Sequence, residues 1–157
     1  MSALPLPAEP MRLALIGAGN RAQTTYLPLW ESLKPWCRPV AVCDPVAEHG
    51  GPLAAALGVP AYTDIRQLVR DRPMEAALVV TPVESHHSLS VYLSSHGIHN
   101  HTETTWASMV CQARQMIAAA RETGWWLGWP RISFVCQWTA LPRRCAIAGS
   151  WAASGGW

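Results

Sequence analysis

The residues best suited to chemistry follow a short apolar run near the start of the chain. The segment Gly17-Ala18-Gly19-Asn20-Arg21-Ala22 comes directly after apolar residues 13–16. Gly17 permits a tight turn, Gly19 lets a ligand approach the backbone, and Ala22 keeps a following helix close to a sheet. Free N–H groups at the start of that helix would face phosphates. The spacing is that of a dinucleotide-binding turn, a pattern that also occurs in turns without a ligand.

A carboxylate stands at the second informative position. Asp44 ends the apolar run 40–43 and lies 25 residues after Gly19. An acid at about this separation accepts hydrogen bonds from the adenosine ribose and repels a 2′-phosphate, which predicts NAD as the cofactor. Arg21 and Arg38 leave NADP open, since either side chain could reach a 2′-phosphate. The alternative for Asp44-Pro45 is a turn with no ligand.

These residues need a framework, and the pattern of apolar residues predicts one. We expect strands within residues 12–16, 40–43, 59–62, 76–80 and 98–102, and helices within 21–34, 47–57, 65–70, 85–95 and 106–123. The first helix should bury Tyr26, Leu29, Trp30 and Leu33, while Gly50-Gly51-Pro52 should delay the regular part of the second helix to Leu53. Alternating strands and helices predict an α/β fold with a doubly wound, Rossmann-like parallel sheet of order 3-2-1-4-5.

This order brings the glycine turn, Asp44 and Thr81-Pro82 to one edge of the sheet. With Tyr62-Thr63-Asp64, Thr81-Pro82-x-x-x-His86 and Gly97-Ile98-His99 followed by Glu103, the chain resembles the N-terminal domain of the Gfo/Idh/MocA oxidoreductases. The resemblance implies hydride transfer between a nicotinamide dinucleotide and a sugar, cyclitol or related compound. The cofactor-binding residues that it implies are Gly17, Gly19, Asn20, Arg21, Ala22, Asp44, Thr81, Pro82 and Glu103.

The sequence also departs from this family. Where the family has Glu-Lys-Pro, this chain has Glu103-Thr104-Thr105, so the lysine expected beside the nicotinamide is absent. Thr104 can donate a hydrogen bond but supplies neither a cation nor an acid. No catalytic residue is assigned; the candidates are His86, Glu103 and Thr104. For His86 we favour a partly solvated position at the start of a helix over a catalytic role.

The two ends of the chain differ from the central part. We expect a flexible leader over residues 1–10, the nucleotide-binding domain over 11–124 and a Trp-rich, poorly ordered tail over 125–157. The tail holds six of the nine tryptophans and no acidic residue, and we hypothesise that it is read out of frame. About thirty residues follow Gly124, so we expect the family's second α/β domain, which holds the substrate, to be missing and the enzyme to be truncated and weakly active or inactive alone.

Two other functional classes remain open. One is a non-catalytic NAD-binding or interaction module. The other is a methyltransferase, which the apolar residues before Gly17 disfavour because such enzymes usually carry an acid there. Titration with NADH, NADPH and S-adenosylmethionine would separate these classes.

Composition excludes several further classes. The net charge of +2 and the lack of a basic run argue against nucleic acid, and no apolar run is long enough to span a membrane. The five cysteines lack metal or redox spacing, which favours reduced thiols and a cytoplasmic location. We expect no metal, although His96, His99, His101 and Glu103 lie close in sequence, because strand ends at a crevice carry polar residues anyway. The sequence predicts no oligomeric state.

Overall fold

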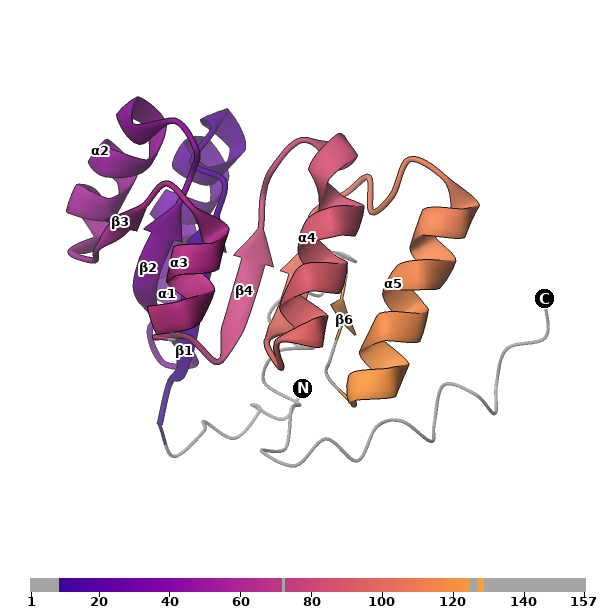
Figure 1. Ribbon diagram of the computed structural model, residues 1–157. Helices are drawn as coiled ribbons and strands as arrows, with labels where there is room; N and C mark the ends of the chain where they lie inside the picture. The colour runs from indigo at the N-terminus through magenta and orange to yellow at the C-terminus, as the bar shows by residue number, and fades with distance from the viewer. Residues whose placement is uncertain (1–8, 72, 125–126, 129–157) are drawn as a thin grey trace, which may run out of the picture.

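The chain folds as a three-layer α/β unit with one parallel sheet between helices (Figure 1). The computed structural model describes residues 9–71, 73–124 and 127–128 of the 157. The strands are β1 (Met11–Ile16), β2 (Cys37–Cys43), β3 (Ala61–Tyr62), β4 (Ala76–Val79), β5 (His99–Thr102) and β6 (Leu127–Gly128). The helices are the π-helix η1 (Ala22–Tyr26), α1 (Leu27–Leu33), α2 (Ala47–Leu57), α3 (Ile65–Asp71), α4 (Val83–Ser95) and α5 (Val110–Thr123).

The strand order is β3-β2-β1-β4-β5-β6, and every described pairing is parallel. The predicted order 3-2-1-4-5 is therefore confirmed, with β6 added beside β5. Leu127 and Gly128 of β6 pair with Asn100 and His101. The other residues of the tail, 125–126 and 129–157, and the leader up to residue 8 lie outside the described residues, so the predictions for them stay predictions.

Strand β1 supplies both hydrophobic cores because successive side chains of a strand point to opposite faces. Leu13 and Leu15 pack on the side of η1, α1 and α2, whereas Ala14 and Ile16 pack on the side of α3 and α4. All four are at most 3% exposed. Burying a leucine side chain contributes roughly 1.5–3 kcal/mol, so this strand anchors both layers.

The first helix buries a narrower stripe than the sequence predicts. Tyr26, Trp30 and Leu33 are buried in the core of that face. Leu29 is 45% exposed, so its predicted burial is wrong. The buried residues follow the spacing i, i+4 and i+7, which leaves Leu29 at the margin of the contact with the sheet.

The second helix is continuous from Ala47, so the predicted delay to Leu53 is wrong. Glycine and proline usually interrupt a helix, but here tertiary packing decides. Gly50 is buried where α2 meets the end of β2, and a Cβ on it would lie 3.4 Å from the Cβ of Asp44. The helix ends at Leu57, as predicted, and Gly58 follows it in the left-handed conformation.

Two further helices begin at other residues than predicted. Helix α4 begins at Val83, directly after Pro82, because the fixed φ of Pro82 suits the residue before a helix. Helix α5 begins at Val110, not Trp106, and the side chain of Gln112 accepts the Met109 N–H at 3.2 Å. Helix α5 packs on α4 and ends at Thr123, as predicted.

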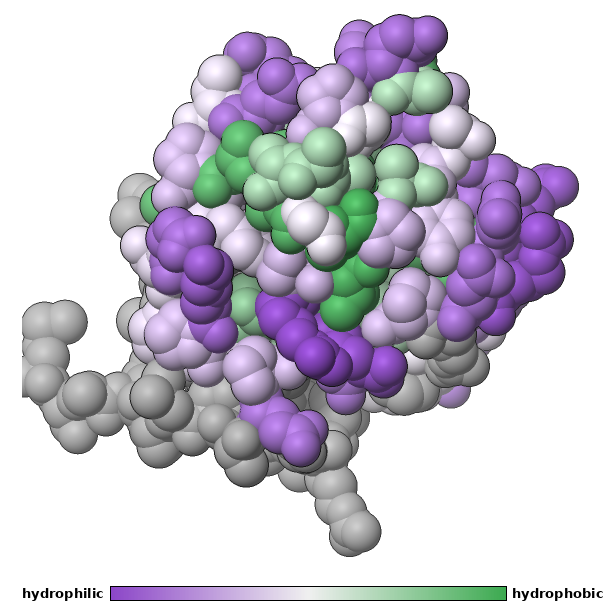
Figure 2. Space-filling model, turned by 90° about the vertical axis from the view of Figure 1, so that its left-hand side faces the viewer, coloured by the Kyte–Doolittle hydropathy of each residue, from purple (hydrophilic) through white to green (hydrophobic). Residues whose placement is uncertain are grey.

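At the β3 edge, hydrophilic side chains surround a smaller apolar area on the face formed by α2, β3 and α3 (Figure 2). Strand β3 is only two residues long, and short edge strands limit pairing with other chains. No helix in the described part of the chain is both long and apolar enough to cross a membrane.

Candidate nucleotide-binding site

The glycine turn leaves β1 in a conformation that needs glycine. Gly17 has φ of +94°, and a Cβ there would lie 2.7 Å from the carbonyl oxygen of Val80. The Gly17 N–H donates to the Cys43 carbonyl at 2.8 Å, so the turn is joined to β2 as well as β4. In contrast, a Cβ on Gly19 would meet no atom within 4 Å. The backbone of Gly19 therefore faces open space.

Asp44 is held in one orientation at the end of β2. It is buried, and its two carboxylate oxygens accept the N–H groups of Ala18 at 2.7 Å and Val46 at 2.9 Å. A carboxylate has about four lone-pair sites, so each oxygen retains acceptor capacity. On the solvent side, Nδ1 of the half-exposed His49 lies 3.9 Å from Oδ1. The sequence did not single out His49, because its approach to Asp44 depends on how α2 packs.

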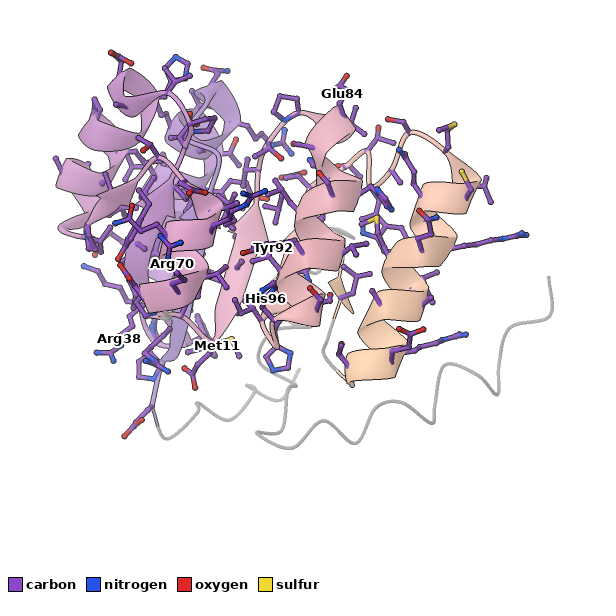
Figure 3. The ribbon with its side chains drawn as sticks, viewed as in Figure 1. Met11, Arg38, Arg70, Glu84, Tyr92 and His96 are labelled. Carbon is purple, nitrogen blue, oxygen red and sulfur yellow. The ribbon has the colours of Figure 1, made fainter. Side chains whose placement is uncertain are left out.

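Arg38 is too far from this edge to reach a 2′-phosphate bound beside Asp44. It pairs with Arg12 near the start of the parallel strands β1 and β2, whereas Asp44 follows the end of β2. Figure 3 shows Arg38 with Met11 at one end of the sheet and Glu84 at the other. Six residues of strand separate Arg38 from Asp44, roughly 20 Å. The prediction for Arg38 is wrong because residues at opposite ends of a strand face opposite edges.

Glu103 connects β5 to the segment that follows the glycine turn. Its Oε1 accepts hydrogen bonds from the Tyr26 hydroxyl and from Arg21 Nε, the latter at 3.2 Å. Its Oε2 accepts the Thr104 N–H at 2.9 Å and the Thr104 hydroxyl at 3.2 Å. Both oxygens of this buried carboxylate are thus engaged by the chain itself.

These contacts keep Glu103 ionised. Burial alone would raise its pKa, but the hydrogen bonds from Tyr26 and Thr104 and the charge of Arg21 outweigh burial and lower the pKa. Burial and the Glu103 carboxylate together raise the pKa of Tyr26, so its phenol stays protonated as a donor. Tyr26 was predicted only as a core residue, because its position in a helical stripe gives no sign of a partner 77 residues away.

His86 is not partly solvated, so that prediction is wrong. It is 1% exposed, and both ring nitrogens lie against backbone carbonyls. Nε2 lies 2.7 Å from the Thr81 oxygen and Nδ1 lies 2.8 Å from the Thr105 oxygen. The sequence predicts a solvated histidine at the start of a helix because the residue that covers it, Thr105, lies 19 residues further along the chain.

The remaining predicted residues flank this edge. Ala22 is fully buried, and the Asn20 carbonyl accepts the Thr24 hydroxyl at 2.8 Å. Thr81 lies against the glycine turn, where its Cγ2 would be 2.9 Å from a Cβ on Gly17. Pro82 is the exposed residue before α4. The structure thus brings together the glycine turn, Asp44, Thr81 and Glu103.

The described residues contain no cluster of three or more His, Cys, Asp or Glu side chains that could hold a metal ion. Burial lowers the pKa of His101 to about 4, so this strand residue is neutral near pH 7. Cys37 and Cys43 are buried free thiols, and Cys111 is an exposed one. Cys136 and Cys145 lie beyond the described residues.

Comparison with known proteins decides the family. The model of the oxidoreductase family with an NAD-binding Rossmann fold, Gfo/Idh/MocA, matches residues 11–128. The chain belongs to this family. Among curated proteins, none matches the chain.

Three solved structures illustrate the likeness to Gfo/Idh/MocA folds. The WlbA dehydrogenase from Chromobacterium violaceum, solved with NADH and UDP-GlcNAcA, is 21% identical with a TM-score of 0.74, over 83% of this chain and 38% of that one. Myo-inositol 2-dehydrogenase from Lactobacillus plantarum is 18% identical with a TM-score of 0.70, over 78% and 36%. A 3-ketoreductase from Actinomadura kijaniata, solved with NADP and TDP-benzene, is 22% identical with a TM-score of 0.72, over 77% and 37%. The chain spans little more than a third of each neighbour.

Proposed function

We propose that the chain binds a nicotinamide dinucleotide along the carboxyl edge of its sheet and forms the cofactor-binding part of a Gfo/Idh/MocA oxidoreductase. The observation that carries this proposal is the pair of glycines. Gly17 is fixed against Val80 at the end of β4, and a Cβ on Gly19 would meet only open space. A site for a pyrophosphate needs both properties within one turn.

The adenosine half belongs at the ends of β1 and β2. The Asp44 carboxylate is oriented by the Ala18 and Val46 N–H groups and keeps acceptor capacity for a ribose diol. Its negative charge disfavours a 2′-phosphate, which supports NAD over NADP. Arg21 is the cation near this edge that could accommodate the 2′-phosphate of NADP.

The nicotinamide half belongs at the ends of β4 and β5. Thr81, Pro82 and Glu103 would line it, with Arg21 and Tyr26 holding the Glu103 carboxylate in place. A bound nicotinamide would supply a hydride donor or acceptor. The substrates that we propose for the complete oxidoreductase are a sugar, a cyclitol or a related compound, as for the family neighbours with such names.

Thr104 supports a second candidate function, a cofactor-binding module without turnover. Its N–H and hydroxyl both donate to the adjacent Glu103, so Thr104 offers neither of these donors to a substrate. In the sequence motif, Thr104 stands where the family has lysine. This candidate shares the cofactor site and differs only in catalysis.

One experiment tests the shared site and separates the two candidates. The full chain is titrated with NADH and NADPH, followed by nicotinamide fluorescence, and is then assayed with NAD⁺ and a panel of sugars and cyclitols. Saturable NADH binding is expected. The absence of any response to both dinucleotides would overturn the proposal, and binding without turnover would favour the module.

A further inference from the structure

His86 joins two loops that are far apart in sequence. It lies in the first turns of α4, with its ring between the β4–α4 loop and the β5–α5 loop. One ring nitrogen meets the Thr81 carbonyl and the other meets the Thr105 carbonyl, at 2.7 and 2.8 Å. We call this pair of contacts the His86 bridge.

Burial excludes direct contact between His86 and a substrate. The side chain is 1% exposed, and its two nitrogens both face carbonyl oxygens, which only accept hydrogen bonds. A neutral ring donates to one carbonyl and a doubly protonated ring donates to both. In either state the ring acts on the backbone, so its role is to position the two loops.

Each bridged loop carries residues of the nicotinamide half. Thr81 lies against Gly17, and Thr105 follows Thr104, which donates to Glu103. The contacts that orient Asp44 come from Ala18 and Val46, which lie outside both bridged loops. The bridge therefore acts on the two loops of the nicotinamide half, whereas Asp44 in the adenosine half is oriented by N–H groups from other segments.

We propose that His86 is a positioning residue for the nicotinamide half of the cofactor, setting the separation of the β4–α4 and β5–α5 loops. This inference rests on the proposed function. It predicts a selective effect on binding. Loss of His86 weakens the binding of a complete dinucleotide but not the binding of a ligand that occupies only the adenosine half.

The test compares NADH with ADP on the full chain by isothermal titration calorimetry. His86→Phe keeps a ring and removes both ring nitrogens, so the Kd for NADH is expected to rise about 5-fold if one hydrogen bond is lost, as for a neutral ring, and about 30-fold if two are lost, as for a doubly protonated ring. His86→Gln places its amide near the Nε2 position and His86→Asn near Nδ1, so at least one of the two variants keeps a donor at a bridged carbonyl and should show a smaller rise in the Kd for NADH than His86→Phe. The Kd for ADP stays within about twofold in all three variants.

His87→Phe is the matched control, since His87 is the next residue of α4 and is only partly buried. It should bind NADH and ADP as the original chain does. A His86→Phe variant that weakens NADH and ADP in parallel would overturn the positioning role, because that is the signature of general damage to the fold. Unchanged NADH binding in His86→Phe would overturn it as well. If the original chain binds neither nucleotide, the proposed function itself fails.

Discussion

Replacing each glycine of the turn by alanine should separate folding from binding. Gly17→Ala forces a side chain into φ of +94° and places its Cβ 2.7 Å from the Val80 oxygen and 2.9 Å from Thr81 Cγ2. The conformational cost is about 1–2 kcal/mol. Overpacking against backbone adds about 1–3 kcal/mol. We expect a loss of about 2–5 kcal/mol, or a Tm lower by roughly 8–20 °C.

Gly19→Ala should weaken cofactor binding and leave the stability of the fold unchanged. Its Cβ meets nothing within 4 Å and its φ lies outside the left-handed region, so the free energy of unfolding should stay within about 0.5 kcal/mol. The added methyl group would occupy the space that a pyrophosphate needs, and the Kd for NADH should rise at least about tenfold.

Thermal melts and NADH titrations of the two variants and the original chain measure both effects. The reasoning is refuted if Gly17→Ala has the same Tm as the original chain, because the contact of its Cβ with the backbone would then cost no stability. It is also refuted if Gly19→Ala binds NADH as tightly as the original chain does.

Three further changes test other parts of the structure. Asp44→Asn removes the charge beside Ala18 and should raise the preference for NADPH over NADH about tenfold. This is the repulsion between the carboxylate and one charge of the 2′-phosphate at roughly 6 Å and an effective dielectric constant of about 40. Paired titrations with NADH and NADPH measure the ratio of the two Kd values. Burial lowers the pKa of His101 to about 4 from 6.5, so the unfolded chain binds a proton in this window that the folded chain does not. The free energy of unfolding should therefore fall by roughly 3 kcal/mol as the pH drops from about 6.5 to about 4, and urea unfolding of His101→Gln should show a smaller slope. Met116 is the only buried residue of α5 within the described part of the chain, and Met116→Ala should lower the free energy of unfolding in urea by about 2–4 kcal/mol. Ile117 is 37% exposed, and Ile117→Ala should lower it by about 1 kcal/mol or less.

The sequence predicts the sheet well because its signals are local. Apolar runs before Gly17 and Asp44 predict buried strands. Helices between the strands predict parallel pairing with right-handed crossovers, and the strand–glycine–helix start predicts the order 3-2-1-4-5. The glycine turn and Asp44 could be placed at one edge for the same reason. Their contact through the Ala18 N–H then follows from the parallel pairing of β1 and β2.

The remainder depends on contacts between distant segments. Tyr26 and His86 bind partners that no local pattern reveals. Arg38 was misplaced because β2 begins at Cys37, before the predicted strand, which puts Arg38 at the far end of the strand from Asp44. The Gly50-Gly51-Pro52 signal failed because α2 packs against the end of β2, where Gly50 is buried beside Asp44. In each case tertiary structure decides what local propensity leaves open.

The most direct test of the account locates the cofactor on the folded chain. Two-dimensional NMR of the ¹⁵N-labelled chain is recorded during titration with NAD⁺. We expect the largest changes in amide shift at Gly17 to Ala22, with further changes at Thr81 and Thr104. Shifts confined to the opposite edge, around Arg12 and Arg38, or no shifts at all, would contradict the account.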